Sequence, residues 1–183
     1  GQMQDAELSY LKAIKIDPNL ANVHSNLGNI QRNQGKTIEA ELSFRKAIEI
    51  NPDFAIAHSN LGNIYRDQGK TIQAELSYLK AIKIDPNFAI AHSNLGTIFR
   101  GQGKIKEAEL SFRKAIELNP DFSNAYFNLG SLLKDLSKYE EAFELLFKSK
   151  ELNPSNLNID LVITSLLRDS DHTQLNQIKL RNL

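Results

Sequence analysis

The stretch that decides the fold is residues 55–88, AIAHSNLGNIYRDQGKTIQAELSYLKAIKIDPNF. When the sequence is shifted by 34 residues it aligns with itself, and the residue types at Leu61, Gly62, Ala74 and Pro86 recur in register. A period of this length is typical of solenoids built from two-helix units, none of which buries its apolar faces alone. The sequence therefore predicts an all-α protein, an α-solenoid of helix-turn-helix repeats.

Each repeat contains two predicted helices. Leu61, Ile64 and Tyr65 fall three or four residues apart, which predicts a helix with one apolar face. Gly69 ends this helix, because glycine suits the position just past a helix C-terminus. Pro86 ends the second helix, because proline cannot continue the backbone hydrogen-bond ladder. The same reading predicts helices over 21–34, 37–50, 55–68, 71–84, 89–102, 105–118, 123–136 and 139–152.

The packing of the two helices is predicted from their small and apolar residues. The second helix carries apolar residues at helical spacing, namely Ile72, Leu76, Leu79 and Ile82. A mid-helix glycine such as Gly62 costs roughly 1 kcal/mol against alanine, so we expect a close backbone approach to offset that cost. The expected facing residues of Gly28, Gly62, Gly96 and Gly130 are Ala40, Ala74, Ala108 and Ala142.

The domain organisation follows from the period. We expect four full repeats, over 21–54, 55–88, 89–122 and 123–156, in a single continuous repeat domain with one core. Residues 1–20 form a half repeat that supplies only a second helix, as expected of a chain cut from a longer array. Residues 157–183 are expected to form C-terminal capping helices, over about 157–168 and about 171–181, because terminal repeats are atypical. A linker into a following domain is the alternative.

The composition argues against several classes of protein. The 22 acidic and 22 basic residues balance, whereas a nucleic-acid binder usually carries a basic excess. With no cysteine there is neither a disulfide framework nor a thiolate metal site. There is no run of about 18 apolar residues to span a membrane and no signal peptide, so we expect a cytoplasmic protein. No cofactor is expected.

The recurring residues resemble the tetratricopeptide repeat, whose signature is W-x2-L-G-x2-Y, then A-x3-F, then P. In the third full repeat the matching residues are Leu95, Gly96, Phe99, Ala108, Phe112, Ala115 and Pro120. The signature's tryptophan is replaced by His24, His58, His92 and Tyr126, and its first tyrosine by Gln31 and Leu133. The resemblance runs to about residue 156 and implies a right-handed superhelix whose first helices line the concave face. It also implies a non-enzymatic scaffold for protein–protein interaction.

Polar residues on the first helices form the candidate binding site. Spacings of three and four place Asn60, Asn63 and Arg66 on one stripe of their helix. An amide both donates and accepts hydrogen bonds, as the peptide backbone does, so we expect a ladder of amides to hold an extended peptide. Alternatively, these amides face solvent or bond to adjacent helices. The candidate groove residues are Asn26, Asn29, Arg32, Asn60, Asn63, Arg66, Asn94, Arg100, Asn128 and Lys134.

The resemblance also bears on partners. Co-chaperone domains of this family that bind a C-terminal carboxylate place a lysine four residues before such an asparagine, and here those positions are Asn22, Ile56, Ile90 and Asn124. Binding of heat-shock-protein tails is therefore not expected. The long Asn-Leu-Gly ladder resembles the superhelix of O-linked N-acetylglucosamine transferases. The alternative function is thus a substrate-recruiting arm of a larger modifying enzyme, and a further option is self-association through the exposed first helix, using Leu8, Leu11 and Ile14.

The recurring histidines are candidates for metal ligands. Neighbouring helix axes lie about 8–10 Å apart, and equivalent helices lie farther apart still. Zinc requires its ligand nitrogens at about 2.0–2.1 Å from one ion. We therefore expect His24, His58 and His92 to pack between repeats, and we expect no metal site.

Overall fold

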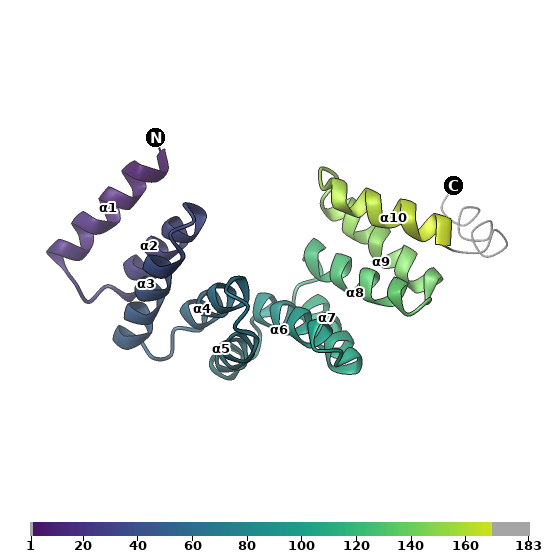
Figure 1. Cartoon of the computed structure of the whole chain (residues 1–183), viewed down its shortest axis with the longest axis horizontal. Helices are drawn as coiled ribbons and strands as arrows, with labels where there is room; N and C mark the ends of the chain where they lie inside the picture. The colour runs from purple at the N-terminus through teal and green to yellow at the C-terminus, as the bar shows by residue number, and fades with distance from the viewer. Residues whose placement is uncertain (1, 170–183) are drawn as a thin grey trace. The chain divides into compact units, whose positions relative to one another are not determined.

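The computed structural model describes residues 2–169 of the 183-residue chain. This part of the chain consists of ten α-helices and contains no strand (Figure 1). The helices are α1 (Gln2–Ile16), α2 (Ala21–Asn33), α3 (Thr37–Ile50), α4 (Ala55–Asp67), α5 (Thr71–Ile84), α6 (Ala89–Gly101), α7 (Ile105–Leu118), α8 (Ser123–Asp135), α9 (Tyr139–Leu152) and α10 (Leu157–Asp169).

The prediction of an all-α helical repeat protein is confirmed. All eight helices predicted between residues 21 and 152 begin at the predicted residue, and each ends there or one residue earlier. The helix expected over about 157–168 is α10, and the one expected over about 171–181 lies outside the described residues. No helix between residues 2 and 169 is long and apolar enough to cross a membrane.

The turn from first to second helix uses left-handed backbone. Gly35, Gly69 and Gly103 have φ angles of 76°, 73° and 73°, and Ser137 takes the same conformation in the fourth repeat with a φ of 59°. A side chain in this region costs roughly 1–2 kcal/mol, which explains the preference for glycine. A Cβ atom at the three glycines would meet nothing within 4 Å, so conformation rather than space selects them.

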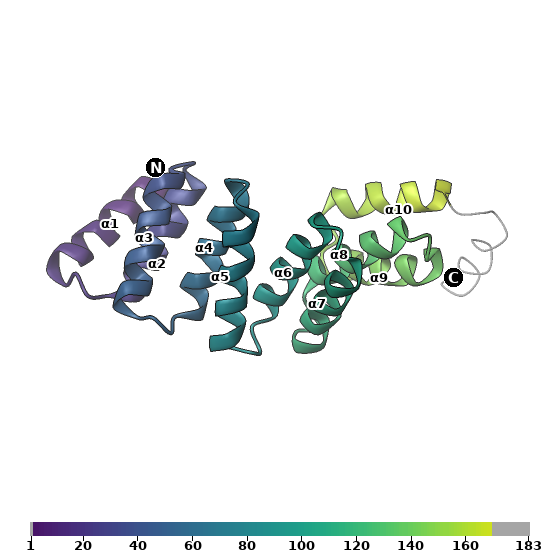
Figure 2. The same ribbon diagram turned by 60° about the horizontal axis from the view of Figure 1, so that its bottom comes forward.

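The chain divides into two compact units, Gly1–Ile98 (unit 1) and Phe99–Leu183 (unit 2). Unit 1 contains the helical hairpins α2–α3 and α4–α5, and unit 2 contains the hairpin α8–α9. The two helices of each hairpin lie side by side in both views (Figures 1 and 2). Within unit 1, α1 also packs on α2 and α3 on α4; within unit 2, α7 packs on α8 and α10 on α9. Each unit therefore buries its apolar surface by stacking helices on their neighbours in sequence.

The second helices α5 and α7 each bury a narrow face made of two alanines and one aromatic residue, whereas α9 buries Ala142, Phe143, Leu146 and Ser149. In α5 these residues are Ala74, Tyr78 and Ala81, all without solvent exposure. The large residues that the spacing placed on the apolar face are instead exposed: Ile72 by 71%, Leu76 by 61% and Leu79 by 41%. Ile82 is half-buried. The apolar spacing of these residues therefore predicted the helix correctly, but the first three do not lie on its buried face.

The glycines of the first helices do mark a close approach, as expected, but the side chain opposite is not that of the predicted alanine. At Gly130 the backbone oxygen of the predicted Ala142 would also lie 3.2 Å from a Cβ atom. A Cβ atom on Gly62 would lie 2.7 Å from Cε1 of the Tyr78 ring, not against Ala74. The facing residue lies four positions after the predicted alanine, one helical turn further along the second helix. Equivalent contacts join Gly28 to Phe44 in unit 1 and Gly130 to Leu146 in unit 2. Glycine is therefore required because a large side chain, rather than a second small residue, fills the space opposite.

Candidate functional site

The predicted site residues of unit 1 lie on the first helices of their repeats. We call these residues the polar face of unit 1: Asn26, Asn29 and Arg32 on α2, Asn60, Asn63 and Arg66 on α4, and Asn94 on α6. Asn26 is exposed and the other six are half-buried, so each keeps part of its surface open to solvent. The helical spacing of three residues on α2 and α4 keeps each set on one side of its helix.

Two of the predicted asparagines are brought together by the structure. The hydroxyl of Tyr78 donates to Oδ1 of Asn63 at 2.9 Å, and Nδ2 of Asn94 donates to the same oxygen at 3.2 Å. The alternative interpretation, in which the amides bond to adjacent helices, is therefore correct for this pair. The pairing uses the oxygen of Asn63 and leaves its amide group with donors, while Oδ1 of Asn94 stays an acceptor.

The cations of unit 1 are paired with a carboxylate of the protein itself. Nη2 of Arg32 lies 2.7 Å from Oδ2 of Asp67, and Nη2 of Arg66 lies 3.1 Å from Oδ1 of the same residue. Burial acts to raise the pKa of Asp67, but the hydrogen bonds from Arg32 and Arg66 outweigh it and hold the pKa below its usual value. One ionised carboxylate thus serves two guanidinium groups.

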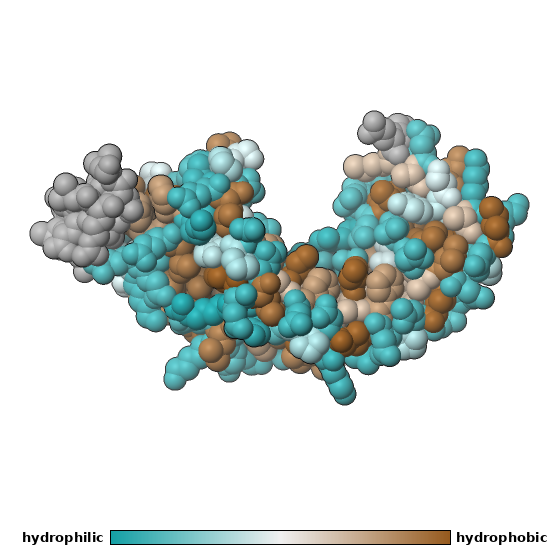
Figure 3. Space-filling model, turned by 180° about the vertical axis from the view of Figure 1, so that it is seen from behind, coloured by the Kyte–Doolittle hydropathy of each residue, from teal (hydrophilic) through white to brown (hydrophobic). Residues whose placement is uncertain are grey.

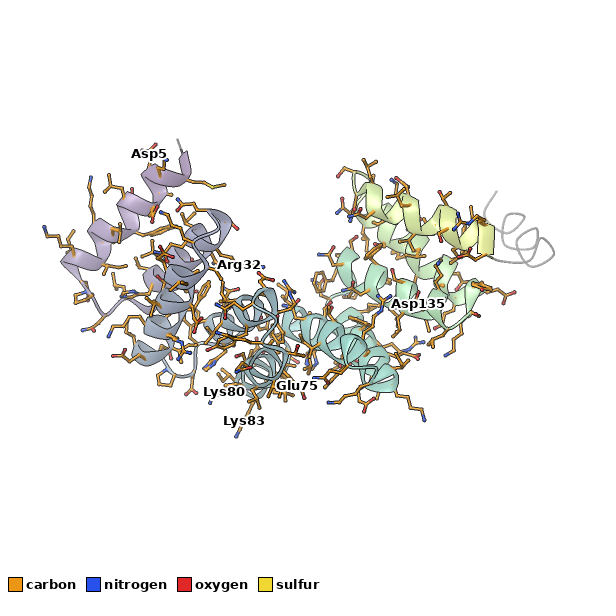
Figure 4. The ribbon with its side chains drawn as sticks, viewed as in Figure 1. Asp5, Arg32, Glu75, Lys80, Lys83 and Asp135 are labelled. Atoms are coloured by element: carbon orange, nitrogen blue, oxygen red, sulfur yellow. The ribbon has the colours of Figure 1, made fainter. Side chains whose placement is uncertain are left out.

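In unit 2 the predicted cations are also paired with carboxylates of the protein, but here each cation has an aspartate of its own on a following helix. Arg100 on α6 pairs with Asp135 on α8, and Figure 4 labels Asp135 on that helix. Nζ of Lys134 on α8 lies 3.1 Å from Oδ2 of Asp169 on α10, and this hydrogen bond lowers the pKa of Asp169. Asn128, the remaining predicted residue, is half-buried on α8. The predicted cations of unit 2 therefore already carry acidic partners.

Sequence reasoning did not pair these carboxylates with the cations, although the sequence carries a signal for the pairing. The separation from Arg32 to Asp67 is 35 residues, and it recurs from Arg100 to Asp135. The same separation joins Lys134 to Asp169. This separation is one residue more than the 34-residue period. A search for acidic residues 35 positions after Arg32, Arg100 and Lys134 therefore finds the aspartate that pairs with each of them. The same search from Arg66 finds Gly101, which has no carboxylate.

The histidines bind the turns before their helices. Nε2 of His24, His58 and His92 lies 2.9–3.0 Å from the backbone oxygen of Pro18, Pro52 and Pro86, respectively. A carbonyl oxygen can only accept, so the histidine nitrogen carries the hydrogen in each pair. The histidine therefore ties the first turn of its helix to the proline turn that ends the preceding repeat. Within residues 2–169, no group of three or more acidic or histidine residues is arranged to hold a metal ion.

A second set of polar contacts joins α1 and α3 to the inter-helix turn of the following repeat. Oε2 of Glu41 accepts from Nε2 of Gln68 at 3.0 Å, and Oε2 of Glu7 accepts from Nε2 of Gln34 at 2.9 Å. Nζ of Lys36 also lies 2.9 Å from Glu7. These glutamates have only 17% of their side-chain surface exposed, so they act between repeats rather than as a solvated face.

Two surface cavities lie in unit 2, away from the predicted residues. One, of about 280 Å³, is lined by residues 137–141 at the start of α9. The other, of about 250 Å³, is lined by Lys106, Glu109 and Leu110 on α7. Neither of these two cavities is lined by a predicted site residue.

These features define the class of the protein. Two-helix units with a glycine close approach, proline turns and a polar first helix are characteristic of all-α helical repeat scaffolds for protein interaction. A family model described as TPR repeat matches residues 1–35, 28–69 and 62–103, and models described as tetratricopeptide repeat match 89–122 and 111–144. The chain belongs to the tetratricopeptide repeat family, whose fold is typically a non-catalytic scaffold.

Several solved structures, two of them described as TPR proteins, have the same fold. TTC0263, a thermophilic TPR protein of Thermus thermophilus, superposes with a TM-score of 0.76 at 21% identity, covering 91% of each chain. PilF of Pseudomonas aeruginosa gives 0.72 at 26% identity, covering 92% of this chain and 70% of its own. YrrB, described as a TPR protein with an unusual peptide-binding site, gives 0.67 at 22%, covering 86% and 81%. Among curated protein sequences, none matched this chain.

Proposed function

We propose that the polar face of unit 1 binds an extended segment of a partner protein through its asparagine side chains. The observation that carries the proposal is the Asn63–Asn94 pair. Because this pair uses one oxygen and one amide hydrogen, it leaves donors on Asn63 and an acceptor on Asn94. A peptide backbone offers the complementary set, a carbonyl oxygen and an N–H, in every residue.

The other asparagines of the polar face support the proposal. Within residues 2–169, no hydrogen bond is found for the side chains of Asn26, Asn29 and Asn60. Asparagine is a poor helix former, so its repeated presence on these helices is unfavourable unless the amide is used. A net hydrogen bond contributes about 0.5–1.5 kcal/mol, so several amides together are needed to hold a peptide. YrrB, which has the same fold, is described as having a peptide-binding site.

A double substitution tests the proposal. Asn60→Ala with Asn94→Ala removes two amides of the polar face, and at about 1 kcal/mol each the affinity for a selected peptide is expected to fall by roughly 30-fold. Peptides are first selected on the full chain from a random library, and affinity is then measured by fluorescence anisotropy.

The matched control is Asn19→Ala with Asn87→Ala, which alters two exposed asparagines in the proline turns. The control is expected to bind as the unmodified chain does, and circular dichroism checks that both variants are folded. If the folded Asn60/Asn94 variant binds the selected peptide with the same affinity as the unmodified chain, the proposal is rejected. Recruitment of substrates to a separate catalytic domain is the alternative form of the same function, since it also requires a peptide on this face.

The predicted self-association through α1 is a second candidate. Leu8 and Leu11 are 52% and 47% exposed on this helix, whereas Ile14 is half-buried. Met3 and Ile16 of α1 are exposed as well, by 51% and 86%. Peptide binding is nevertheless favoured, because the amides of the polar face match the donors and acceptors of a peptide backbone.

A further inference from the structure

The charges on the polar face of unit 1 do not balance. Arg32 and Arg66 both pair with Asp67, which leaves one net positive charge at this point of α2 and α4. The side chains of the three residues are 34%, 35% and 37% exposed, so a ligand can reach them. Figure 4 shows Arg32 at the end of α2 that lies next to α4. In unit 2, by contrast, Arg100 and Asp135 form a pair of one cation and one carboxylate.

The two arginines are not equally well paired. Arg32 places Nε at 3.0 Å and Nη2 at 2.7 Å from Oδ2 of Asp67, as expected for a charge-assisted pair. Arg66 makes contacts of 3.3 and 3.1 Å to Oδ1 of the residue that follows it on the same helix. Both contacts are longer than the about 2.7–2.9 Å that is typical of a charge-assisted pair. Arg66 is therefore the weakly held cation of the polar face.

The lack of a better partner for Arg66 can be followed in the sequence. Arg32, Arg100 and Lys134 are each followed after 35 residues by an aspartate, and each pairs with it. The residue 35 positions after Arg66 is Gly101. Arg66 therefore lacks the aspartate that the other three cations have 35 residues later in the sequence.

A second donor lies beside Arg66. Asn63 precedes it by three residues on α4, and its oxygen already accepts two hydrogen bonds, from Tyr78 and Asn94. What Asn63 can offer a ligand is therefore its NH2 group, a donor. Guanidinium and amide NH2 groups on one side of a helix form a set made only of donors. Such a set favours an acceptor with negative charge, and the guanidinium fork matches the geometry of a carboxylate.

We propose that Arg66, assisted by Arg32 and the amide of Asn63, binds the carboxylate of an acidic side chain in the peptide that lies on the polar face of unit 1. The ligand carboxylate replaces the long contact from Arg66 to Asp67, while Arg32 keeps its short one. This inference rests on the proposed function and adds to it the chemistry and position of one ligand side chain.

The test uses the full chain, immobilised, and three peptide pools of about 12 residues with randomised sequence around one fixed central position. The fixed residue is Glu, Gln or phosphoserine. A charge-assisted hydrogen bond contributes about 1–2 kcal/mol net, so the unmodified chain is expected to retain the Glu pool about 5- to 30-fold more strongly than the Gln pool.

Three variants locate the preference. Arg66→Gln is expected to abolish it. Arg113→Gln, the same substitution on the second helix α7, is the control and is expected to leave the preference intact, because Arg113 lies outside the polar face and already pairs with Glu109 and Glu141. Asp67→Asn is expected to increase it, since both arginines are then released from their internal partner. Raising the salt concentration is expected to reduce it in every case.

The outcomes separate this inference from the proposed function. Retention of Glu and Gln pools to an equal extent, with loss of both in the Asn60/Asn94 variant, would leave peptide binding standing and overturn the acidic site. A Glu preference that survives Arg66→Gln would also overturn it. Stronger retention of the phosphoserine pool than of the Glu pool would assign the site to phosphate instead. Retention of no pool would overturn both proposals.

Discussion

Tyr78 shows how a single side chain connects the packing of unit 1 to its polar face. Its ring is fully buried against Gly62, while its hydroxyl donates to Asn63. Burial raises the pKa of Tyr78 to about 12, against an ordinary value of 10.0, with nearby Arg66 acting in the opposite direction. The equivalent residues in the repeats before and after are Phe44 and Phe112, which have no hydroxyl.

Alkaline pH tests the burial of Tyr78. Its pKa is higher in the folded state, so its contribution to stability is complete below about pH 10 and is lost as the pH rises through about 12. The loss amounts to roughly 2–3 kcal/mol in the free energy of unfolding. Tyr78→Phe is expected to lose about 1 kcal/mol at neutral pH, through the missing hydrogen bond, and to be less sensitive to alkali. Urea unfolding at about pH 7, 10 and 11 measures both effects.

Tyr65 serves as the control, because its pKa is also raised by burial and it is present in both proteins. Ionisation of Tyr65 therefore accounts for the decrease in the free energy of unfolding at alkaline pH that remains in the Tyr78→Phe variant. If the free energy of unfolding falls as steeply with rising pH in the Tyr78→Phe variant as in the unmodified chain, the burial of a neutral Tyr78 phenol is contradicted.

At the residue scale, the sequence predicted which polar side chains share one side of a helix but not how they pair. Helical spacing was enough to place Asn63 and Arg66 on one stripe of α4. The bond from Asn94 to Asn63 was not predictable, because it depends on the distance between two helices of different repeats. Gln31, a departure from the family signature, is explained only by the structure: Ser43 donates to its side chain at 2.6 Å, and both residues are buried.

At the scale of the element, α5 shows what periodicity predicts and what it leaves open. Ala74, Tyr78 and Ala81 are buried, whereas Ile72, Leu76 and Leu79 have the same spacing and are exposed. The two sets are shifted by two residues, which is about 200° around a helix with 3.6 residues per turn. Spacing therefore predicted the helix correctly but could not choose between its opposite faces. Apolar patches are correspondingly visible at the surface (Figure 3), and Lys80 and Lys83 project away from the α4–α5 hairpin (Figure 4).

The close approach of α4 and α5 explains why the small residues, rather than the large ones, are buried. With only 2.7 Å between the Tyr78 ring and a Cβ atom at Gly62, a second large residue on the buried face has no space. Hydrophobicity alone favours burying isoleucine and leucine over alanine. Steric fit between the two helices opposes that preference in α5, and the sequence does not reveal the distance between helices.

Two glycine substitutions test this account of hairpin packing. Gly62→Ala places a Cβ atom against the rigid Tyr78 ring, so it is expected to lower the free energy of unfolding by about 1–3 kcal/mol. Gly101→Ala, at the last residue of α6, meets nothing within 4 Å and is expected to raise it by up to about 1 kcal/mol. Urea denaturation followed by circular dichroism measures both. A Gly62→Ala variant as stable as the unmodified chain would contradict the close approach.

At the scale of the whole molecule, charged side chains form ion pairs both within a repeat, as in Lys46–Glu49, and between repeats, as in Arg32–Asp67. The pKa of Glu7 is lowered by hydrogen bonds from Lys36 and Gln34. Burial acts to raise the pKa of Glu41, but hydrogen bonds from Gln68 and Arg45 lower it overall. Asp67 and Asp169 have lowered pKa values as well. The carboxylates with lowered pKa values thus lie in both units and at contacts between different repeats.

Acid is therefore expected to weaken the fold. A carboxylate with a lowered pKa stabilises the folded state fully above its unfolded value, 4.5 for Glu and 3.8 for Asp, and loses that contribution as the pH falls through its folded value. The free energy of unfolding is expected to stay level from about pH 7 to 5 and to fall below about pH 4.5. Urea unfolding over this range measures the decline.

The variant Glu7→Gln with Glu41→Gln is expected to be less stable at neutral pH and to show a shallower decline in acid. Glu39→Gln is the control, because Glu39 is exposed to solvent on α3, the same helix that carries Glu41. A decline in the double variant as steep as in the unmodified chain would show that other groups cause the acid sensitivity.

The pairing across 35 residues has an evolutionary consequence. A helical array grows by copying repeats, and copies keep the same backbone and the same apolar contacts. Because a cation of one copy is neutralised by an aspartate of the next, a single codon change at that aspartate exposes or hides one positive charge without moving a helix. Arrays of nearly identical repeats can in this way diverge in the ligands that they select.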